Sequence, residues 1–389
     1  MCPRRSRSAT SRFRVSSPRL RMRYMAVREY DVVFVGGGLA AMLLLKELRP
    51  TLPGRFAVID PYPLLERPTV HWSYWSRERT FYDEFAISSW RQARTADAPP
   101  ESLDPFTMRL VRSSDVFAYL AAQLESAPLE WIHASARSIT SHGDGSYEIA
   151  TDDGAVRTRW VFDSACEVAP RFPSPRRPQA VVSGTGVRVE ADRPVFDAAT
   201  ATLFDPLDDQ SFAYLLPLNR EQALLESASF GPAPEEMDEA PLLRYLQARY
   251  PDAKFDVGHA EYGAIPLGFA PSRTTGPRHI LLGTKRGLVK PSAGYGVVRI
   301  AKETEHLMRL WRMRLPLPPT RRAPWWTRLL DTGFLQLAAR DPRLPLALLG
   351  RVMRDMPLSR SLSFIDEELP LRHLASIMRS ASPVVLRKP

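Results

Sequence analysis

The stretch YDVVFVGGGLAAMLLLKELRP, residues 30–50, decides the fold. Its first residues are mostly apolar and β-branched, which is typical of a buried parallel strand. The glycines Gly36–Gly38 follow at once, and the apolar run after them predicts a helix that stops at Pro50. RFAVIDPYP, residues 55–63, predicts a second strand, which ends at Asp60. The order strand, glycine turn, helix, strand indicates a Rossmann-type α/β fold.

The glycine turn has the composition of a dinucleotide site. Glycines let the backbone approach a pyrophosphate, and the helix that follows offers free N–H groups at its positive end. Asp60 lies 22 residues after Gly38, the spacing at which an acid reaches a ribose hydroxyl. We therefore expect contacts to a dinucleotide from Gly36, Gly37, Gly38, Leu39, Ala40 and Asp60. The alternative is a turn that packs a helix on a sheet without a ligand, and the motif alone does not separate FAD from NAD.

A second glycine-rich region, HILLGTKRGLVKPSAGYGVVRIAKETEHLMRLW at 279–311, predicts a strand, a loop and a long helix. Its glycines allow close backbone approach, and Lys290 with the N-terminus of the helix is suited to a phosphate or a flavin edge. Two such turns indicate one extended cofactor that lies between them. A cofactor long enough to reach both turns is more typical of FAD than of NAD. The residues expected here are Gly283, Lys290 and Gly294. Asp163, at the end of the apolar run WVFD, marks either a further approach to the cofactor or an ordinary turn.

Charge is distributed unevenly along the 389 residues, whose net charge is +10. Residues 1–28 contain nine arginines and no acid, and residues 306–389 contain 15 basic and six acidic residues. We interpret residues 1–28 as a disordered basic tail, as a transit peptide, or as sequence upstream of a start at Met25. Nucleic-acid binding is not favoured, because the body between these basic ends is acidic.

Other classes of protein are disfavoured by composition. Two cysteines make no disulfide framework, which predicts a cytoplasmic protein. The seven histidines and two cysteines form no metal-binding motif, so no metal is expected. No run of 18 apolar residues predicts a transmembrane helix.

Glu226 is the candidate catalytic residue. Residues 211–218 and 222–230 alternate in polarity and predict two antiparallel strands joined at Asn219-Arg220. Glu226 interrupts the second strand among apolar and small residues, where burial raises a carboxyl pKa and keeps the group protonated. The alternative is an acid on the solvated face of the strand. Glu261, in HAEYGAIPLGF, is a second and weaker candidate.

We expect three regions in the chain. These are the tail at 1–28, interleaved FAD-binding and substrate-binding domains at 29–305 with a substrate sheet at about 175–275, and a helical region at 306–389. In the last region, Trp325 and Trp326 lie among arginines, and leucines recur at helical spacing. This pattern predicts helices on an anionic bilayer surface or core helices with a basic solvated face.

Several segments together resemble the bacterial lycopene cyclase family, the FAD-dependent lycopene beta-cyclases. They are GGGLAA (36–41), HWSYW (71–75), LLPLNREQALLES (215–227), YGAIPLG (262–268), KPSAGYG (290–296) and FIDEELPLRHLASIM (364–378). The resemblance implies a p-hydroxybenzoate-hydroxylase-like fold with an inserted antiparallel substrate domain. It implies FAD, reduced by NADPH or NADH, and a non-redox isomerase that turns the ψ-ends of lycopene or a related polyene into β-rings.

The family's essential acid lies in a strand reading L-x-E-(E/D)-T. Leu224–Ala228 matches this strand and keeps the first acid as Glu226, but Ser227 and Ala228 replace the second acid and the threonine. The resemblance thus implies an apolar polyene as substrate and a peripheral membrane surface as partner. Alternatives are an FAD-dependent monooxygenase acting on an isoprenoid or aromatic substrate, and a non-catalytic prenyl-lipid binder.

Overall fold

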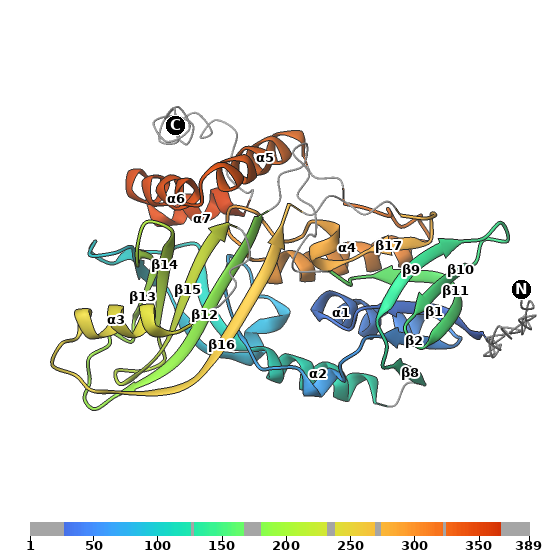
Figure 1. Cartoon of the computed structure of the whole chain (residues 1–389), viewed down its shortest axis with the longest axis horizontal. Helices are drawn as coiled ribbons and strands as arrows, with labels where there is room; N and C mark the ends of the chain where they lie inside the picture. Colours follow the sequence, from blue (N-terminus) through green and yellow to red (C-terminus); the bar gives the residue numbers. More distant parts are fainter. Residues whose placement is uncertain are drawn as a thin grey trace, which may run out of the picture.

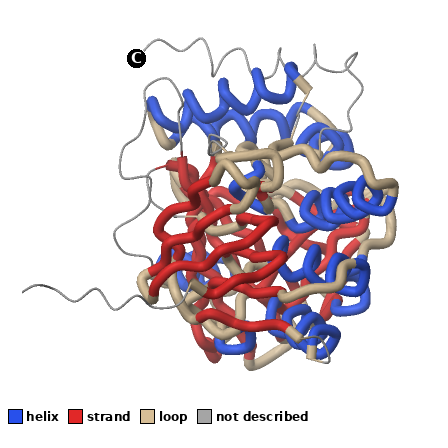
Figure 2. Tube along the Cα trace, turned by 90° about the vertical axis from the view of Figure 1, so that its right-hand side faces the viewer, coloured by secondary structure: helices blue, strands red, loops and turns tan. Residues whose placement is uncertain are grey.

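The fold was obtained as a computed structural model (Figure 1). It describes residues 27–125, 128–166, 180–231, 238–268, 274–321 and 324–366. The chain has three sheets, with helices on their faces and three helices at one end (Figures 1 and 2). The tail expected at 1–28 lies outside the described residues except for Val27 and Arg28, and Arg28 already begins the first strand. Of the segment 364–378, only residues 364–366 are described.

The first sheet carries the Rossmann-type unit. Its strands, in sheet order, are β8 (Leu129–Ile132), β2 (Phe56–Ile59), β1 (Arg28–Val35), β11 (Gly154–Asp163), β10 (Tyr147–Thr151) and β9 (Ala136–Ser141), and β17 (His279–Leu281) also pairs with β11. The pairs that β1 and β2 make with each other, with β8 and with β11 are parallel. The predicted strand, glycine turn, helix and second strand are therefore confirmed.

Alternating side chains place different cores on the two faces of this sheet. Val32 and Phe34 of β1 pack with α1 (Leu39–Leu48), α2 (Ser113–Leu124) and α4 (Val297–Arg312). Val33 and Val35 face the opposite way, toward residues of the β9–β10 meander. Helices thus cover one face, and the antiparallel meander covers part of the other.

The second sheet is long and almost entirely antiparallel. Its order is β16 (Phe255–Leu267), β12 (Ala180–Ala191), β15 (Gln222–Gly231), β14 (Ser211–Pro217), β13 (Thr200–Pro206), β5 (Gln92–Arg94) and β6 (Glu101–Ser102). One face packs on α3 (Ala240–Arg249) through residues such as Val187, Leu225 and Leu242. The predicted strand pair around Asn219-Arg220 is confirmed as β14 and β15, and the fold class expected from the sequence is correct.

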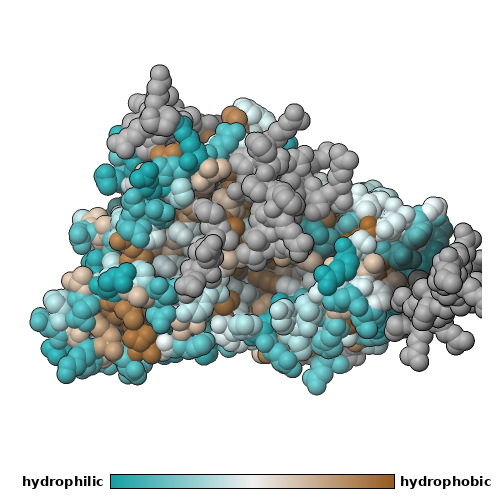
Figure 3. Space-filling model, viewed as in Figure 1, coloured by the Kyte–Doolittle hydropathy of each residue, from teal (hydrophilic) through white to brown (hydrophobic). Residues whose placement is uncertain are grey.

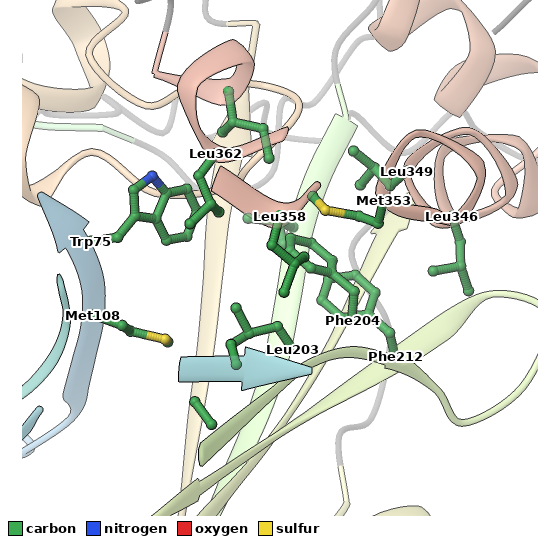
Figure 4. Packing of buried hydrophobic residues seen from close by; sticks show 14 of the residues in the cluster. Trp75, Met108, Leu203, Phe204, Phe212, Leu346, Leu349, Met353, Leu358 and Leu362 are labelled. Carbon is green, nitrogen blue, oxygen red and sulfur yellow. The ribbon is translucent and has the colours of Figure 1, made fainter. Parts of the chain in front are cut away.

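A third, small sheet lies between the other two and was not expected from the sequence. It consists of β3 (His71–Ser76), β7 (Thr107–Arg112) and β4 (Ala86–Trp90), with β7 in the middle. Trp75 and Met108 of this sheet join the apolar core beneath the second sheet (Figure 4). The segment HWSYW therefore carries residues from the first domain toward the second sheet.

One face of each C-terminal helix packs against the apolar core beneath the second sheet. The helices are α5 (Trp325–Arg340), α6 (Arg343–Asp355) and α7 (Leu358–Ile365), above one end of the second sheet in Figure 1. Leu346, Leu349 and Met353 of α6 point into the same core as Phe204 and Phe212 of the sheet (Figure 4). Most leucines of this region are buried against the substrate sheet, so for them the alternative of core helices holds. No helix in the described ranges is long and apolar enough to span a bilayer.

Candidate active site

A cavity of about 460 Å³ lies between the second sheet, the third sheet and the start of α1. We call it the central cavity. It is lined by Leu39 of α1, by residues 70–73 of β3 and its approach, by β12, β15 and β16, and by the segment from Val289 to Ile300. The central cavity therefore joins the glycine turn of the first domain to the strand that carries Glu226.

One cross-strand row of the second sheet forms the chemical part of the cavity. Tyr214 pairs with Glu226, Glu226 pairs with Gly186, and Gly186 pairs with Glu261. Residues directly opposite on neighbouring strands point to the same face. Both glutamates therefore project from one face, and the glycine between them carries no side chain.

The next row toward the C-terminal end of β15 begins at Phe212 of β14 and continues with three small residues. Ala228 pairs with Gly184, and Gly184 pairs with Gly263. A Cβ atom on Gly184 would lie 2.5 Å from the backbone oxygen of Ser227, and one on Gly186 would lie 2.6 Å from Glu261 Oε1. The floor of the cavity therefore depends on glycine at both positions of β12.

The Glu226 carboxyl borders this cavity and is otherwise enclosed by protein. Its pKa is raised to about 8, first by burial and second by the negative charge of Glu261. Ser73 Oγ donates a hydrogen bond to Glu226 Oε2 at 3.3 Å, which opposes that rise. Glu226 is therefore mostly protonated at neutral pH, as the apolar strand around it predicted.

Glu261 is held by His71. The His71 backbone N–H donates to Glu261 Oε2 at 3.0 Å, and ring atom Nδ1 lies 3.1 Å from the same oxygen. A carboxylate there requires Nδ1 to carry the ring proton. Both side chains are only 15% exposed. The two glutamates thus have different surroundings, a hydroxyl donor for Glu226 and two N–H donors for Glu261.

The rest of the lining is aromatic and small. Among the described residues that line the central cavity there is no lysine or arginine, and the aromatic ones are Trp72, Trp75, Tyr214, Tyr262 and Tyr295. The Trp75 and Tyr295 rings lie with centroids 4.5 Å apart. Two carboxyl groups and several π-faces, with His71 as the one basic side chain among these described lining residues, favour a positively charged species in the cavity.

The predicted cofactor turn is built around Asp60. Gly37 N–H donates to Asp60 Oδ2 at 2.7 Å, and Arg67 Nη2 lies 2.6 Å from the same oxygen. Gly36 has φ +87°, and a Cβ there would lie 2.7 Å from Ser164 Oγ. The acid at the end of β2 therefore fixes the glycine turn itself, and its expected contact with a ribose stays a prediction.

The start of α1 has the features of an anion cradle. Gly38 is the N-cap, makes no side-chain capping bond, and has open space where a Cβ would lie. Leu39 and Ala40, the first residues of the helix, are buried. The helix therefore presents its first N–H groups beside open space and without a capping side chain, which fits a pyrophosphate.

Two buried donors near the same turn, Arg67 Nε and Trp131 Nε1, have no hydrogen-bond partner among the described residues. The Trp131 ring lies so close to Gly37 that a Cβ there would be 2.6 Å from it. Orphaned donors beside an uncapped helix start fit the polar groups of a dinucleotide such as FAD.

The second glycine-rich segment connects the two domains. Gly283 has φ +55°, and a Cβ on it would lie 3.2 Å from Ala40 Cβ. Gly294 has φ +70°, and a Cβ on it would lie 2.8 Å from Val182 of β12. These glycines therefore fit the segment closely between α1 and the substrate sheet, and their expected approach to a cofactor stays a prediction.

Two charged residues near this segment form ion pairs within the protein. The buried Lys290 Nζ lies 2.6 Å from Asp331 Oδ1 of α5, so its ammonium is bound to a carboxylate, and a contact with phosphate or flavin stays a prediction. Asp163 is 1% exposed and lies 2.5 Å from Lys285 Nζ and 3.2 Å from His279 Nε2. Asp163 thus ties the end of β11 to the turn at Gly283–Arg286.

The sequence model of the family described as "Lycopene cyclase protein" matches residues 31–331. No curated protein matches the sequence.

Solved structures of similar fold have low sequence identity. A geranylgeranyl bacteriochlorophyll reductase-like protein from Thermoplasma acidophilum is 12% identical, with a TM-score of 0.55, over 92% of this chain and 100% of that one. The p-nitrophenol 4-monooxygenase PnpA from Pseudomonas putida DLL-E4 is 14% identical, with a TM-score of 0.52, over 93% and 100%. The flavin-dependent brominase Bmp2 is 16% identical, with a TM-score of 0.54, over 91% and 93%. These likenesses show the fold.

Proposed function

The chain belongs to the lycopene cyclase family, and from this premise we propose that it binds FAD and cyclises the ψ-ends of lycopene, or of a related polyene, to β-rings. The observation that carries the proposal is Glu226, an acid with a pKa of about 8 in a cavity of aromatic rings. The reaction is an isomerisation, because atoms and electrons are rearranged but not gained or lost.

Glu226 is suited to protonate an alkene. A trisubstituted alkene is a weak base, so its protonation needs an enclosed and well-aimed acid. Glu226 gives its proton to the terminal double bond, and a tertiary cation forms on the neighbouring carbon. The next double bond attacks this cation and closes a six-membered ring. Loss of a proton from the ring then leaves the new double bond.

The cavity wall is suited to the cation. The faces of Trp75 and Tyr295 offer negative π-density, and the Glu261 carboxylate offers a full negative charge on the same sheet face. A lysine or arginine in this position would raise the energy of the cation. The described residues that line the cavity include neither.

FAD is supported by the glycine turn and by the uncapped start of α1. Gly36, Gly37, Gly38, Leu39, Ala40, Gly283 and Gly294 are the residues that would hold it. When bound and reduced, FAD supplies an electron-rich ring that stabilises positive charge. NADPH or NADH would be needed only to reduce it, because the cyclisation consumes no electrons.

The departure from the family's acidic strand is accommodated in two ways. Ala228, in place of the threonine, lies opposite Gly184 and leaves the floor of the cavity open. The Ser227 hydroxyl, in place of the second acid, accepts a hydrogen bond from the Thr185 backbone N–H at 3.3 Å. Neither replacement removes the donor at Glu226.

The alternative function is that of an FAD-dependent monooxygenase with an isoprenoid or aromatic substrate. The fold shared with p-nitrophenol 4-monooxygenase is compatible with it. Consumption of oxygen and NADPH in proportion to product would support the monooxygenase and exclude the cyclase. The acidic and aromatic lining of the cavity favours cation chemistry.

We also propose that the protein docks on an anionic membrane surface, where an apolar polyene is found. Trp325 and Leu329, one turn apart on α5, are 76% and 65% exposed, and Arg328 lies between them in sequence. Residues 306–389 carry nine more basic than acidic groups, which complements anionic lipid. The hydrophilic surface in Figure 3 is interrupted by separate apolar patches. Sedimentation with phosphatidylglycerol vesicles should fall in the double variant Trp325→Ser/Leu329→Ser, and unchanged sedimentation would refute docking through α5.

The direct test of the function is expression in a bacterial host that accumulates lycopene. We expect pigments with β-rings from the wild type and uncyclised lycopene from Glu226→Gln. The purified variant should still show the absorbance of bound FAD. Lycopene left unchanged by the wild type, with FAD bound, would refute this substrate. Normal cyclisation by Glu226→Gln would remove Glu226 from the mechanism.

A further inference from the structure

The position of Glu261 raises the question of where the proton leaves the substrate. Glu226 and Glu261 are paired with the same residue, Gly186, from the strands on either side of it. Their Cα atoms are therefore about two strand spacings apart, roughly 10 Å. The Glu261 side chain lies over Gly186, since a Cβ there would be 2.6 Å from its Oε1, and both glutamates line the central cavity. A six-membered ring bound in the cavity against this sheet face would therefore meet the two carboxyl groups at different points of its edge.

The two carboxyl groups are prepared for opposite proton transfers. Glu226 is enclosed, receives a hydroxyl hydrogen bond from Ser73, and is suited to give a proton. Glu261 accepts the His71 backbone N–H, and the same carboxyl oxygen faces Nδ1 of the His71 ring. The remaining polar neighbour in the row is Tyr214, beside Glu226 and two strands away from Gly186.

Resting on the function proposed above, we propose that Glu261 is the base that removes the proton from the closed ring, and that His71 is the positioning residue that holds its carboxyl group in place. The carbon that gains a proton and the carbon that loses one are different atoms of the ring. An acid and a base that line one cavity at different points can serve both without movement of the substrate. After ring closure, a C–H bond next to the cationic carbon breaks, its electron pair becomes the ring double bond, and the proton passes to Glu261. Glu261 then releases this proton to solvent, and Glu226 takes up a proton from solvent before the next turnover.

The position of the base determines which ring isomer is formed. The cation can lose a proton from more than one neighbouring carbon, and each loss places the double bond differently. A base fixed on one side of the ring selects one of these carbons. Glu261 therefore determines product identity as well as rate, which separates it from a residue that only shapes the cavity or only adjusts Glu226.

The test compares the purified, FAD-loaded wild type, Glu261→Gln and Glu190→Gln, with reduced cofactor and lycopene in vesicles. Glu190 is an exposed acid on the same strand as Gly186 and forms a hydrogen bond with Gln222, so it is a matched control outside the cavity. We expect Glu261→Gln to form β-rings about 100-fold more slowly. A larger share of its product should be ring isomers with a displaced double bond, or alcohols from capture of the cation by water. Glu190→Gln should match the wild type.

The results that would overturn the proposal are read from the composition of the product. A Glu261→Gln variant with the wild-type composition, whether slow or fast, would overturn the proposal. If that variant does not fold, His71→Gln is tested in its place. This substitution removes the contact between the imidazole and Glu261 and should shift the product composition in the same direction. An unshifted composition in His71→Gln would then overturn it. Absence of any ring product from the wild type would instead refute the proposed function itself.

Discussion

Glu226 and Glu261 face the same cavity from the two strands that flank Gly186, and the pKa of Glu226 is raised to about 8. Burial is the main cause, and the charge of Glu261 adds to it. The protein thus places two carboxyl groups on one sheet face beside the central cavity. This relationship gives predictions for stability, for coupling between the two groups and for substrate entry.

The first prediction concerns the cost of burying Glu226. The unfolded carboxyl loses its proton near pH 4.5 and the folded one near pH 8. Between these values the unfolded state binds fewer protons, so the stability of the fold decreases as pH rises, by about 1.4 kcal/mol per unit. Glu226→Gln should therefore raise the melting temperature of the apoprotein at pH 8 but not at pH 4.5. Glu190→Gln is the control, and a Glu226→Gln variant less stable than wild type at pH 8 would contradict the burial argument.

The second prediction concerns coupling between the two acids. Replacing Glu261 by glutamine removes a negative charge, so the pKa of Glu226 should fall below about 8. The loss of stability between pH 4.5 and 8 should then be smaller than in the wild type. The two single substitutions should also be non-additive in the double variant, because each relieves part of the same repulsion. Additive changes in melting temperature at pH 8 would show that the carboxyl groups do not interact.

The third prediction concerns room for the polyene. Gly263 lies opposite Gly184, and a Cβ on it would meet nothing within 4 Å. Gly263→Leu should therefore fold normally and bind FAD, but lower kcat/KM by more than about tenfold because the side chain occupies the cavity. Gly143→Leu, in the turn between β9 and β10, is the control, since a Cβ there also meets nothing. Equal turnover by the two variants would mean that substrate does not pass Gly263.

The fourth prediction separates two glycines of the cofactor turn. Gly38 has φ −73°, which any residue adopts, and open space beside it, so Gly38→Val should leave the apoprotein stable but weaken FAD binding at least about 100-fold. Gly36 has φ +87° and close neighbours, so Gly36→Ala should destabilise the apoprotein by roughly 1–3 kcal/mol. Melting curves and fluorescence titration with FAD measure both effects. Full FAD affinity in Gly38→Val would place the pyrophosphate elsewhere.

The parts of this account that the sequence predicted depend on short-range patterns. The glycine turn, Asp60 and the strand that carries Glu226 each follow from alternation or spacing within a few residues. The neighbourhood of Glu226 is long-range: Ser73 is 153 positions away from it, and His71 is 190 positions away from Glu261. The register in which β15 and β16 pair with β12 decides which of their residues meet Ser73 and His71. No pattern within a few residues of the sequence reveals this register. The buried donors of Arg67 and Trp131 at the cofactor turn were missed for the same reason.

The C-terminal helices show a different limit. Helical spacing of leucines in α5 and α6 predicted helices correctly, but the same apolar face suits lipid and a protein core equally. Packing against Phe212 and Phe230 of the sheet decides in favour of the core for most of these leucines. The same limit applies to Lys290. A lysine in a glycine-rich loop suggests a phosphate site, but its observed partner is the Asp331 carboxylate, 41 positions away in the sequence.

Isotope transfer from solvent tests the central claim most directly. The purified protein, loaded with FAD and reduced chemically without oxygen, would be given lycopene in vesicles prepared in D₂O. Glu226 exchanges its proton with solvent, so each new β-ring from the wild type should carry one deuterium, and Glu226→Gln should form no rings. Rings without deuterium, a product that contains added oxygen, or labelled rings from Glu226→Gln would contradict the account.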